Sequence, residues 1–85
     1  MADFSVNAAH GRFELKQPGG TVFADFRRQD GRLFIDHVET PLAMRGKGAA
    51  ADLMAAISDF AAQEGLTLVP ICSYAAAWMR RHTQV

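Results

Sequence analysis

The segment that decides the fold reads Glu39-Thr40-Pro41-Leu42-Ala43-Met44-Arg45-Gly46-Lys47-Gly48-Ala49-Ala50. Before it, residues 33–38 form a short apolar run that is typical of a strand. After it, apolar residues recur at the spacing of a helix: Leu53, Met54, Ile57, Phe60 and Ala61. A basic, glycine-rich turn therefore connects a strand to a helix.

This turn has the chemistry of an anion-binding site. A helix N-terminus leaves several backbone N–H groups without intrahelical partners and carries a partial positive charge. Glycines at the helix entry let a phosphate approach those donors closely, and Arg45 adds a cation. The expected ligand is a phosphorylated cofactor, although Gly46 and Gly48 would also suit a plain tight turn. Lys47 is interpreted mainly as a solvated charge that adds a salt-sensitive attraction.

Three common phosphate-binding patterns differ in how well this turn fits them. Residues 46–51 fit the dinucleotide form G-x-G-x-x-A, but the strand ends well before Gly46 and no carboxylate closes the next strand. The P-loop form G-x-x-x-x-G-K-[ST] is absent from the sequence. The third form, Arg45-x-x-Gly48-x-Ala50, resembles the coenzyme A pyrophosphate loop of the GNAT superfamily of N-acetyltransferases.

The resemblance continues over residues 37–82, where the chain is similar to small single-domain GNAT-like proteins. Their pattern is matched by His37, Glu39, Pro41, Arg45, Gly46, Gly48, Ala50, Gly65, Leu66, Pro70, Cys72, Tyr74, Arg80, Arg81 and His82. The resemblance implies acetyl-CoA as the cofactor and a pantetheine arm that lies between two splayed strands. It also implies acetyl transfer to an amine.

The resemblance also assigns individual site residues. Those implied to bind the cofactor are Val38, Arg45, Gly46, Lys47, Gly48, Ala49 and Ala50, with Arg80, Arg81 and His82 as a clasp for the 3′-phosphate. Those with implied catalytic roles are His37, Glu39, Cys72 and Tyr74. No metal ligands are expected, because the histidines and the cysteine lack metal-site spacing.

Turn signals divide the chain into short elements. Strands are predicted over 4–8, 12–16, 21–28 and 32–38, followed by a helix over 48–63, a strand over 67–71 and a C-terminal helix. Gly65 is suited to a left-handed helix end. A strand–helix–strand crossover predicts parallel pairing of the last two strands. The fold class is therefore α/β with a mixed sheet of four antiparallel strands and a fifth parallel strand. The resemblance implies a minimal GNAT fold in a single domain of residues 1–85.

His37 and Glu39 are candidates for acid–base chemistry. An amine is protonated at neutral pH and must lose a proton before or during attack, so an imidazole or carboxylate beside it is chemically sensible. The two residues lie two positions apart and share a face if the strand is regular, whereas a bulge would break that relation. The alternative for His37 is a purely structural hydrogen bond.

Two interpretations are open for each of three further features: Cys72, Tyr74 and the arginines of the C-terminal helix. Cys72 is either a small buried apolar residue or a nucleophile whose thiolate is favoured near a helix N-terminus. Tyr74 either packs on the last helix or protonates the departing CoA thiolate. Arg80 and Arg81 suit the end of a helix through the helix dipole even without a ligand.

Composition limits the possible partners. The 85 residues carry nine basic and nine acidic side chains, so the overall field does not favour nucleic acid or anionic lipid. One cysteine excludes an internal disulfide. No apolar run approaches the ~20 residues that span a bilayer, and no leader precedes Asp3. A soluble cytoplasmic protein, monomeric or weakly dimeric, is expected.

The resemblance thus implies an acetyl-CoA-dependent N-acetyltransferase acting on an unknown amine. Compared with longer members, the chain lacks the helices that usually wall the acceptor site, which favours a protein or another large acceptor. The alternative is a non-catalytic CoA-binding or interaction module. A nucleic-acid-binding domain is disfavoured by the neutral charge and by the lack of a basic stripe with interleaved aromatics.

Overall fold

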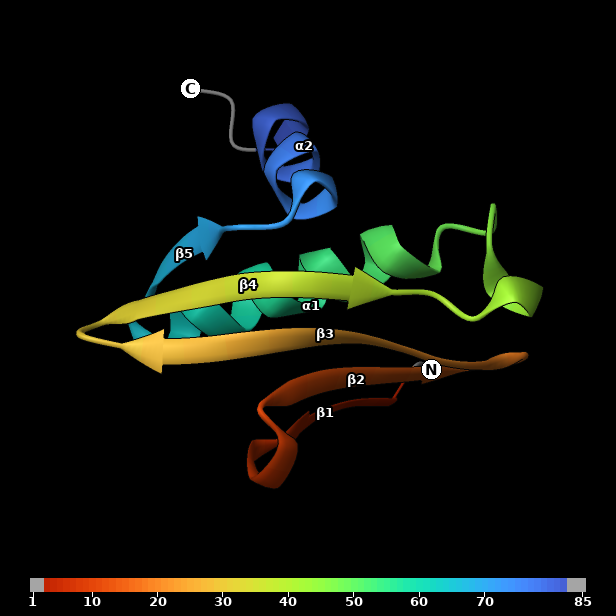
Figure 1. Cartoon of the computed structure of the whole chain (residues 1–85), viewed down its shortest axis with the longest axis horizontal. Coiled ribbons are helices and arrows are strands. Elements are labelled where there is room, and N and C mark those ends of the chain that lie inside the picture. Colours follow the sequence, from red (N-terminus) through yellow and green to blue (C-terminus); the bar gives the residue numbers. More distant parts are fainter. Residues whose placement is uncertain (1–2, 83–85) are drawn as a thin grey trace.

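A mixed five-stranded sheet in the order β1-β2-β3-β4-β5 organises the computed structural model, which describes residues 3–82 (Figure 1). The predicted domain also includes residues 1–2 and 83–85, which lie outside the described residues. The elements are β1 (Asp3–Asn7), a 3-10 turn (Ala8–His10), β2 (Arg12–Gln17), β3 (Gly20–Gln29), β4 (Arg32–Glu39), a 3-10 turn (Leu42–Met44), α1 (Ala49–Glu64), β5 (Thr67–Pro70) and α2 (Ser73–His82).

The sheet topology confirms the predicted fold class. Strands β1 to β4 pair antiparallel in sequence order, and β5 pairs parallel to β4 after the α1 crossover. Gly65 adopts the predicted left-handed conformation, with φ of 68°, and its N–H bonds carbonyls of the last turn of α1. The chain then returns to the sheet, where the Thr67 N–H donates to the Gly31 carbonyl at 2.9 Å.

The hydrophobic core lies between the sheet and α1, which runs behind the strands in Figure 1. Alternate residues of β2, β3 and β4 point toward the helix, as expected for strands with one buried face. The ring of Phe13 lies 4.3 Å from that of Phe26 and 5.3 Å from that of Phe60. The largest fully buried side chains are Phe13, Leu33, Ile35, Leu53, Met54, Ile57 and Val22.

Helix α2 packs at the β4–β5 edge and contacts α1 as well as both strands. Ala75 and Trp78 are its buried residues. Neither helix lies over the front of the strands in Figure 1, so the second sheet face stays uncovered in residues 3–82. On this face Arg12 stacks over Phe23 and Arg27 over Phe34, with guanidinium carbons 3.9 and 4.7 Å from the ring centroids.

A β-bulge in β4 changes which residues face the core. Ile35 pairs with Phe26 and His37 pairs with Asp25, so Asp36 is an extra residue with no opposite partner. An extra residue reverses the alternation of the strand beyond it. Ile35 is therefore buried before the bulge and Val38 packs on the core after it, while His37 is exposed.

Candidate functional site

Strands β4 and β5 separate at the point where the site begins. Their pairing ends at Ile35 and Pro70, and the N–H groups of Ile71 and Cys72 then converge on the Ile35 carbonyl at 2.9 and 3.2 Å. Beyond Ile35, β4 continues to Glu39 while the chain after β5 turns into α2. The last residues of β4 therefore have no strand beside them on the β5 side.

A cavity of about 370 Å³ lies beside the end of β4. Its walls come from β4, the loop before α1, the first turn of α1 and Tyr74 of α2. Cofactor residues predicted from the sequence that line it are Val38, Arg45, Gly46, Gly48, Ala49 and Ala50. Lys47 is exposed and does not line the cavity.

The two glycines of the loop leave the entry of α1 open. Gly46 and Gly48 have φ of 79° and 80°, a left-handed conformation that side chains disfavour. A Cβ built on either residue would meet no atom within 4 Å, so both face open space. Gly48 is the N-cap of α1 and supplies no side-chain hydrogen bond. The first amides of α1 therefore lack the usual capping acceptor.

The loop rests on residues that sequence reasoning did not identify. Met44, only 2% exposed, packs against the β2–β3 turn, where a Cβ on Gly19 would lie 3.3 Å from its Cγ. The Gln17 amide nitrogen donates to Asp52 at 2.9 Å and ties β2 to the first turn of α1. In the sequence, Pro18-Gly19-Gly20 indicates a turn but does not reveal this contact.

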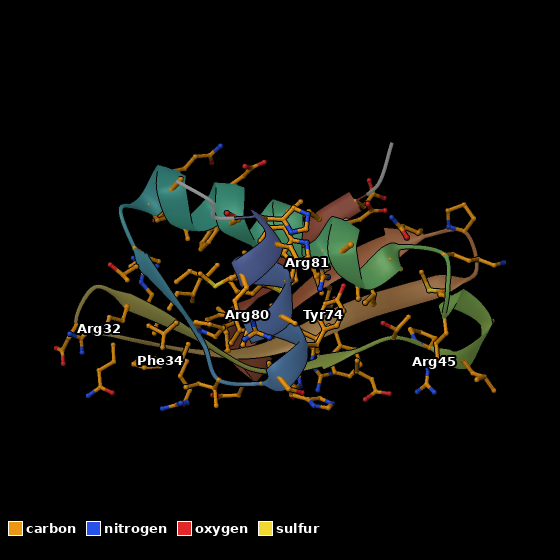
Figure 2. All side chains as sticks on the ribbon, turned by 90° about the horizontal axis from the view of Figure 1, so that it is seen from above. Arg32, Phe34, Arg45, Tyr74, Arg80 and Arg81 are labelled. Atoms are coloured by element: carbon orange, nitrogen blue, oxygen red, sulfur yellow. The ribbon has the colours of Figure 1, made fainter. Side chains whose placement is uncertain are left out.

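A chain of polar contacts runs from the loop to the bulge. The Arg45 Nε donates to the Thr40 carbonyl at 3.2 Å, and its Nη2 lies 3.6 Å from Glu39 Oε2. The other Glu39 oxygen lies 2.9 Å from His37 Nε2. The bulge precedes His37, so His37 and Glu39 keep the shared face that the sequence predicted. Figure 2 shows Arg45 extending away from α1.

Cys72 lies where β4 and β5 begin to separate, whereas Glu39 lies at the far end of β4. It immediately precedes α2, and its Sγ accepts a hydrogen bond from the Ala75 N–H at 3.4 Å. Its backbone lies beside Ile35, four residues before Glu39, which is a separation on the order of 10 Å along a strand. Cys72 therefore caps α2 and does not line the cavity, whereas Tyr74 does.

The three C-terminal residues predicted as a phosphate clasp point in different directions. Figure 2 shows Tyr74 and Arg81 on one side of α2 and Arg80 on the other, as expected for residues seven and six positions apart. The His82 ring stacks on Trp78 at 4.3 Å, and its Nδ1 lies 2.8 Å from the Trp78 carbonyl oxygen. Of the three residues, only Arg81 thus lies on the side of α2 that carries Tyr74, and Tyr74 lines the cavity.

An ion pair braces the bulge itself. The Arg27 Nε and Nη2 donate to the two oxygens of Asp36 at 2.7 and 2.8 Å. These hydrogen bonds hold the pKa of Asp36 below its usual range, because they favour the charged carboxylate against a small opposing effect of burial. The bulge residue is thereby fixed on the uncovered face of the sheet.

A family model described as GCN5-related N-acetyl-transferase matches residues 12–85, which is most of the chain. The chain belongs to this family. The resemblance predicted from the sequence is thereby confirmed, and membership of the GCN5-related N-acetyltransferase family supports an acyltransferase type of function. No match to a curated protein was found.

Two further observations concern the described part of this GCN5-related N-acetyltransferase. None of the helices within residues 3–82 is both long and apolar enough to cross a membrane. In the same residues, His, Cys, Asp and Glu side chains form no group of three or more that could hold a metal ion.

Proposed function

We propose that this member of the GCN5-related N-acetyltransferase family binds acetyl-CoA in the cavity beside β4 and transfers the acetyl group to an amine on a protein or another large acceptor. The observation that carries the proposal is the uncapped glycine entry of α1, placed beside the separation of β4 and β5. In an α/β sheet, ligands bind outside the carboxyl ends of the strands.

The residues around the cavity fit coenzyme A. The pyrophosphate would accept hydrogen bonds from the amides at Gly46 to Ala50, where both glycines face open space. Arg45 lines the same cavity and supplies a guanidinium, which binds phosphate in a bidentate manner. The pantetheine amides would pair with the free edge of β4 around Val38.

The cofactor supplies an activated acetyl thioester, and the side chains supply proton transfers. The His37–Glu39 pair, joined at 2.9 Å, would take the proton that the acceptor ammonium must lose before its nitrogen can attack. Tyr74 lines the cavity, and its hydroxyl would give a proton to the departing thiolate sulfur. The second proton that the attacking nitrogen loses would restore the tyrosine hydroxyl. Cys72 caps α2 outside the cavity, which favours direct transfer over an acetyl-cysteine intermediate.

The uncovered sheet face supports a large acceptor. His37 and Glu39 lie on this face, and no helix covers it in residues 3–82. A small amine would find few walls there, whereas a protein segment can lie across exposed strands. The side chains of His37 and Glu39 are 55% and 42% exposed. Such exposed groups are also consistent with the second candidate, a module that binds CoA without turnover.

Thermal shift with coenzyme A tests the site. At a hundredfold excess over its dissociation constant, a ligand adds about 2.7 kcal/mol and raises Tm by several degrees. Gly48→Asp should remove the shift, because it places a carboxylate where phosphate must approach. Gly31→Asp is the matched control, since Gly31 is also left-handed and faces open space, but lies in the β3–β4 turn.

Two results separate the candidates. Acetylation of lysine-containing peptides or proteins, followed by intact mass with acetyl-CoA, would support the enzyme. A CoA-dependent Tm shift with no acetyl transfer to any amine would favour the binding module. No Tm shift at millimolar CoA would refute the cofactor assignment itself.

A further inference from the structure

Arg45 is engaged by a carboxylate that belongs to the predicted acid–base pair. Its Nη2 lies 3.6 Å from Glu39 Oε2, and its Nε donates to the Thr40 carbonyl. The side chain extends away from α1, so its guanidinium is turned from the amides at the helix entry (Figure 2). Glu39 is shared, because its other oxygen contacts His37.

Both partners of this ion pair line the cavity in which the pyrophosphate is proposed to bind. The pair is exposed, with side-chain exposures of 60% for Arg45 and 42% for Glu39, and exposed ion pairs are weak. A pyrophosphate carries more charge than one carboxylate and accepts two parallel hydrogen bonds from a guanidinium. Gly46 follows Arg45 directly, so the backbone beside it is free to adjust.

We propose that Arg45 exchanges Glu39 for the cofactor pyrophosphate, so that cofactor binding frees the Glu39 carboxylate, which His37 already contacts, for the incoming amine. The inference rests on the proposed function, because it requires the pyrophosphate to bind at the loop. Arg45 then acts as a positioning residue: before the cofactor binds, it neutralises the carboxylate that the reaction uses.

The exchange sets an order of binding. With Arg45 on Glu39, an acceptor ammonium meets a carboxylate that is already paired with a cation. With Arg45 on the pyrophosphate, the same carboxylate attracts the ammonium, so a cationic amine binds better after the cofactor. Coupling of two binding equilibria is reciprocal, and therefore Glu39 must also oppose cofactor binding.

Calorimetric titration with CoA at low ionic strength tests this competition. Glu39→Gln should tighten CoA about twofold to fivefold, the range expected for an exposed ion pair that no longer has to break. In an Arg45→Gln background the same substitution should have no effect on CoA affinity. Asp36→Asn is the matched control, because it removes a carboxylate of the same strand that pairs with Arg27 instead.

Acetyl-pantetheine provides a second probe, since it carries the thioester but no pyrophosphate. Glu39→Gln should leave its affinity unchanged. If Glu39→Gln weakens CoA binding or leaves it unaltered, the pair is a brace for the loop and the exchange is wrong. Equal tightening by Asp36→Asn would overturn it in favour of general charge repulsion. Tightening toward the uncharged acetyl-pantetheine would overturn it by showing that Glu39→Gln acts on the pantetheine arm and not through the pyrophosphate. Wild-type protein that binds no CoA would instead refute the proposed function.

Discussion

Met44 packs so closely under Gly20 that a Cβ on this glycine would lie 3.2 Å from the methionine sulfur. Gly20 also has φ of 146°, a conformation that residues with a side chain rarely adopt. The first residue of β3 thereby supports the 3-10 turn that precedes the glycine loop. A turn distant in sequence thus holds the backbone that the cofactor is proposed to contact.

Gly20→Ala should weaken both the fold and CoA binding. The strained backbone and the contact with Met44 together should reduce the free energy of unfolding by about 1–3 kcal/mol. Displacing Met44 should also move the loop that begins at Arg45. Urea unfolding and CoA titration measure the two effects.

Gly31→Ala is the control for backbone strain alone, since Gly31 is left-handed with no atom within 4 Å of a built Cβ. It should lower stability by about 1 kcal/mol and leave the CoA dissociation constant unchanged where the protein remains folded. Equal loss of CoA affinity in both variants would contradict the role of the Gly20–Met44 contact.

Cys72→Ser should preserve most of the turnover. The serine oxygen can accept the Ala75 N–H as the thiol does, and serine is a favoured N-cap residue. Direct attack by the amine predicts a loss of less than about tenfold, or ~1.4 kcal/mol in activation free energy. His37→Asn or Glu39→Gln should cost ~10²-fold through the lost proton transfer. Steady-state kinetics and Tm of each variant check this.

Cys72→Ala separates the two roles of this residue. It removes the cap on α2 and should lower stability by about 0.5–2 kcal/mol relative to Cys72→Ser, with similar turnover per folded molecule. An acetyl-Cys72 species that passes its acetyl group to an amine at the steady-state rate would show that the thiol carries the acetyl group.

The course of the chain could be predicted because its signals are local. Alternation of apolar residues defines the strands, Asp30 and Gly31 close the β3–β4 hairpin, and Gly65 ends α1 in the left-handed conformation. A helical crossover between two neighbouring strands then favours parallel pairing of β5 with β4. These features depend on short stretches of sequence and on general rules of chain connection.

The bulge and the supports of the loop could not be predicted, because they depend on contacts between distant residues. Asp36 is extra only relative to the register of β3, and a single sequence does not reveal that register. The contact of Met44 with Gly20 and the ion pair of Arg45 with Glu39 depend on side-chain placement after folding. The position of Cys72 as the cap of α2 also depends on side-chain placement after folding.

Asp36→Asn should lower stability in a pH-dependent way. The pKa of Asp36 is lowered in the folded protein by its hydrogen bonds from Arg27. A carboxyl group with a lowered pKa stabilises the fold above its unfolded pKa of about 3.9. That stabilisation is lost as the pH falls through the lower, folded value. The variant should therefore unfold at lower urea concentration at pH 6 and converge with wild type once the pH has fallen below the folded pKa of Asp36.

Asp59→Asn, an exposed substitution on α1, provides the comparison for this pH series. It should follow the wild-type profile at every pH. A constant difference between Asp36→Asn and wild type across the whole range would indicate a packing defect at the bulge instead of a lost ionic hydrogen bond.

Arg81→Gln should weaken CoA binding more than Arg80→Gln does. Tyr74 lines the cavity, and Arg81 lies on the same side of α2, whereas Arg80 lies on the other (Figure 2). A charge-assisted hydrogen bond to the 3′-phosphate would contribute about 1.5–3 kcal/mol when formed fully, and salt screens it at this exposed helix end. We therefore expect a loss of about threefold to tenfold for Arg81→Gln.

Calorimetry with CoA and with 3′-dephospho-CoA separates the phosphate contact from other effects, because the difference between the two arginine variants should vanish for the dephosphorylated ligand. Equal losses for both variants with CoA would show that the two arginines attract the cofactor only through their general charge, and that neither forms a clasp.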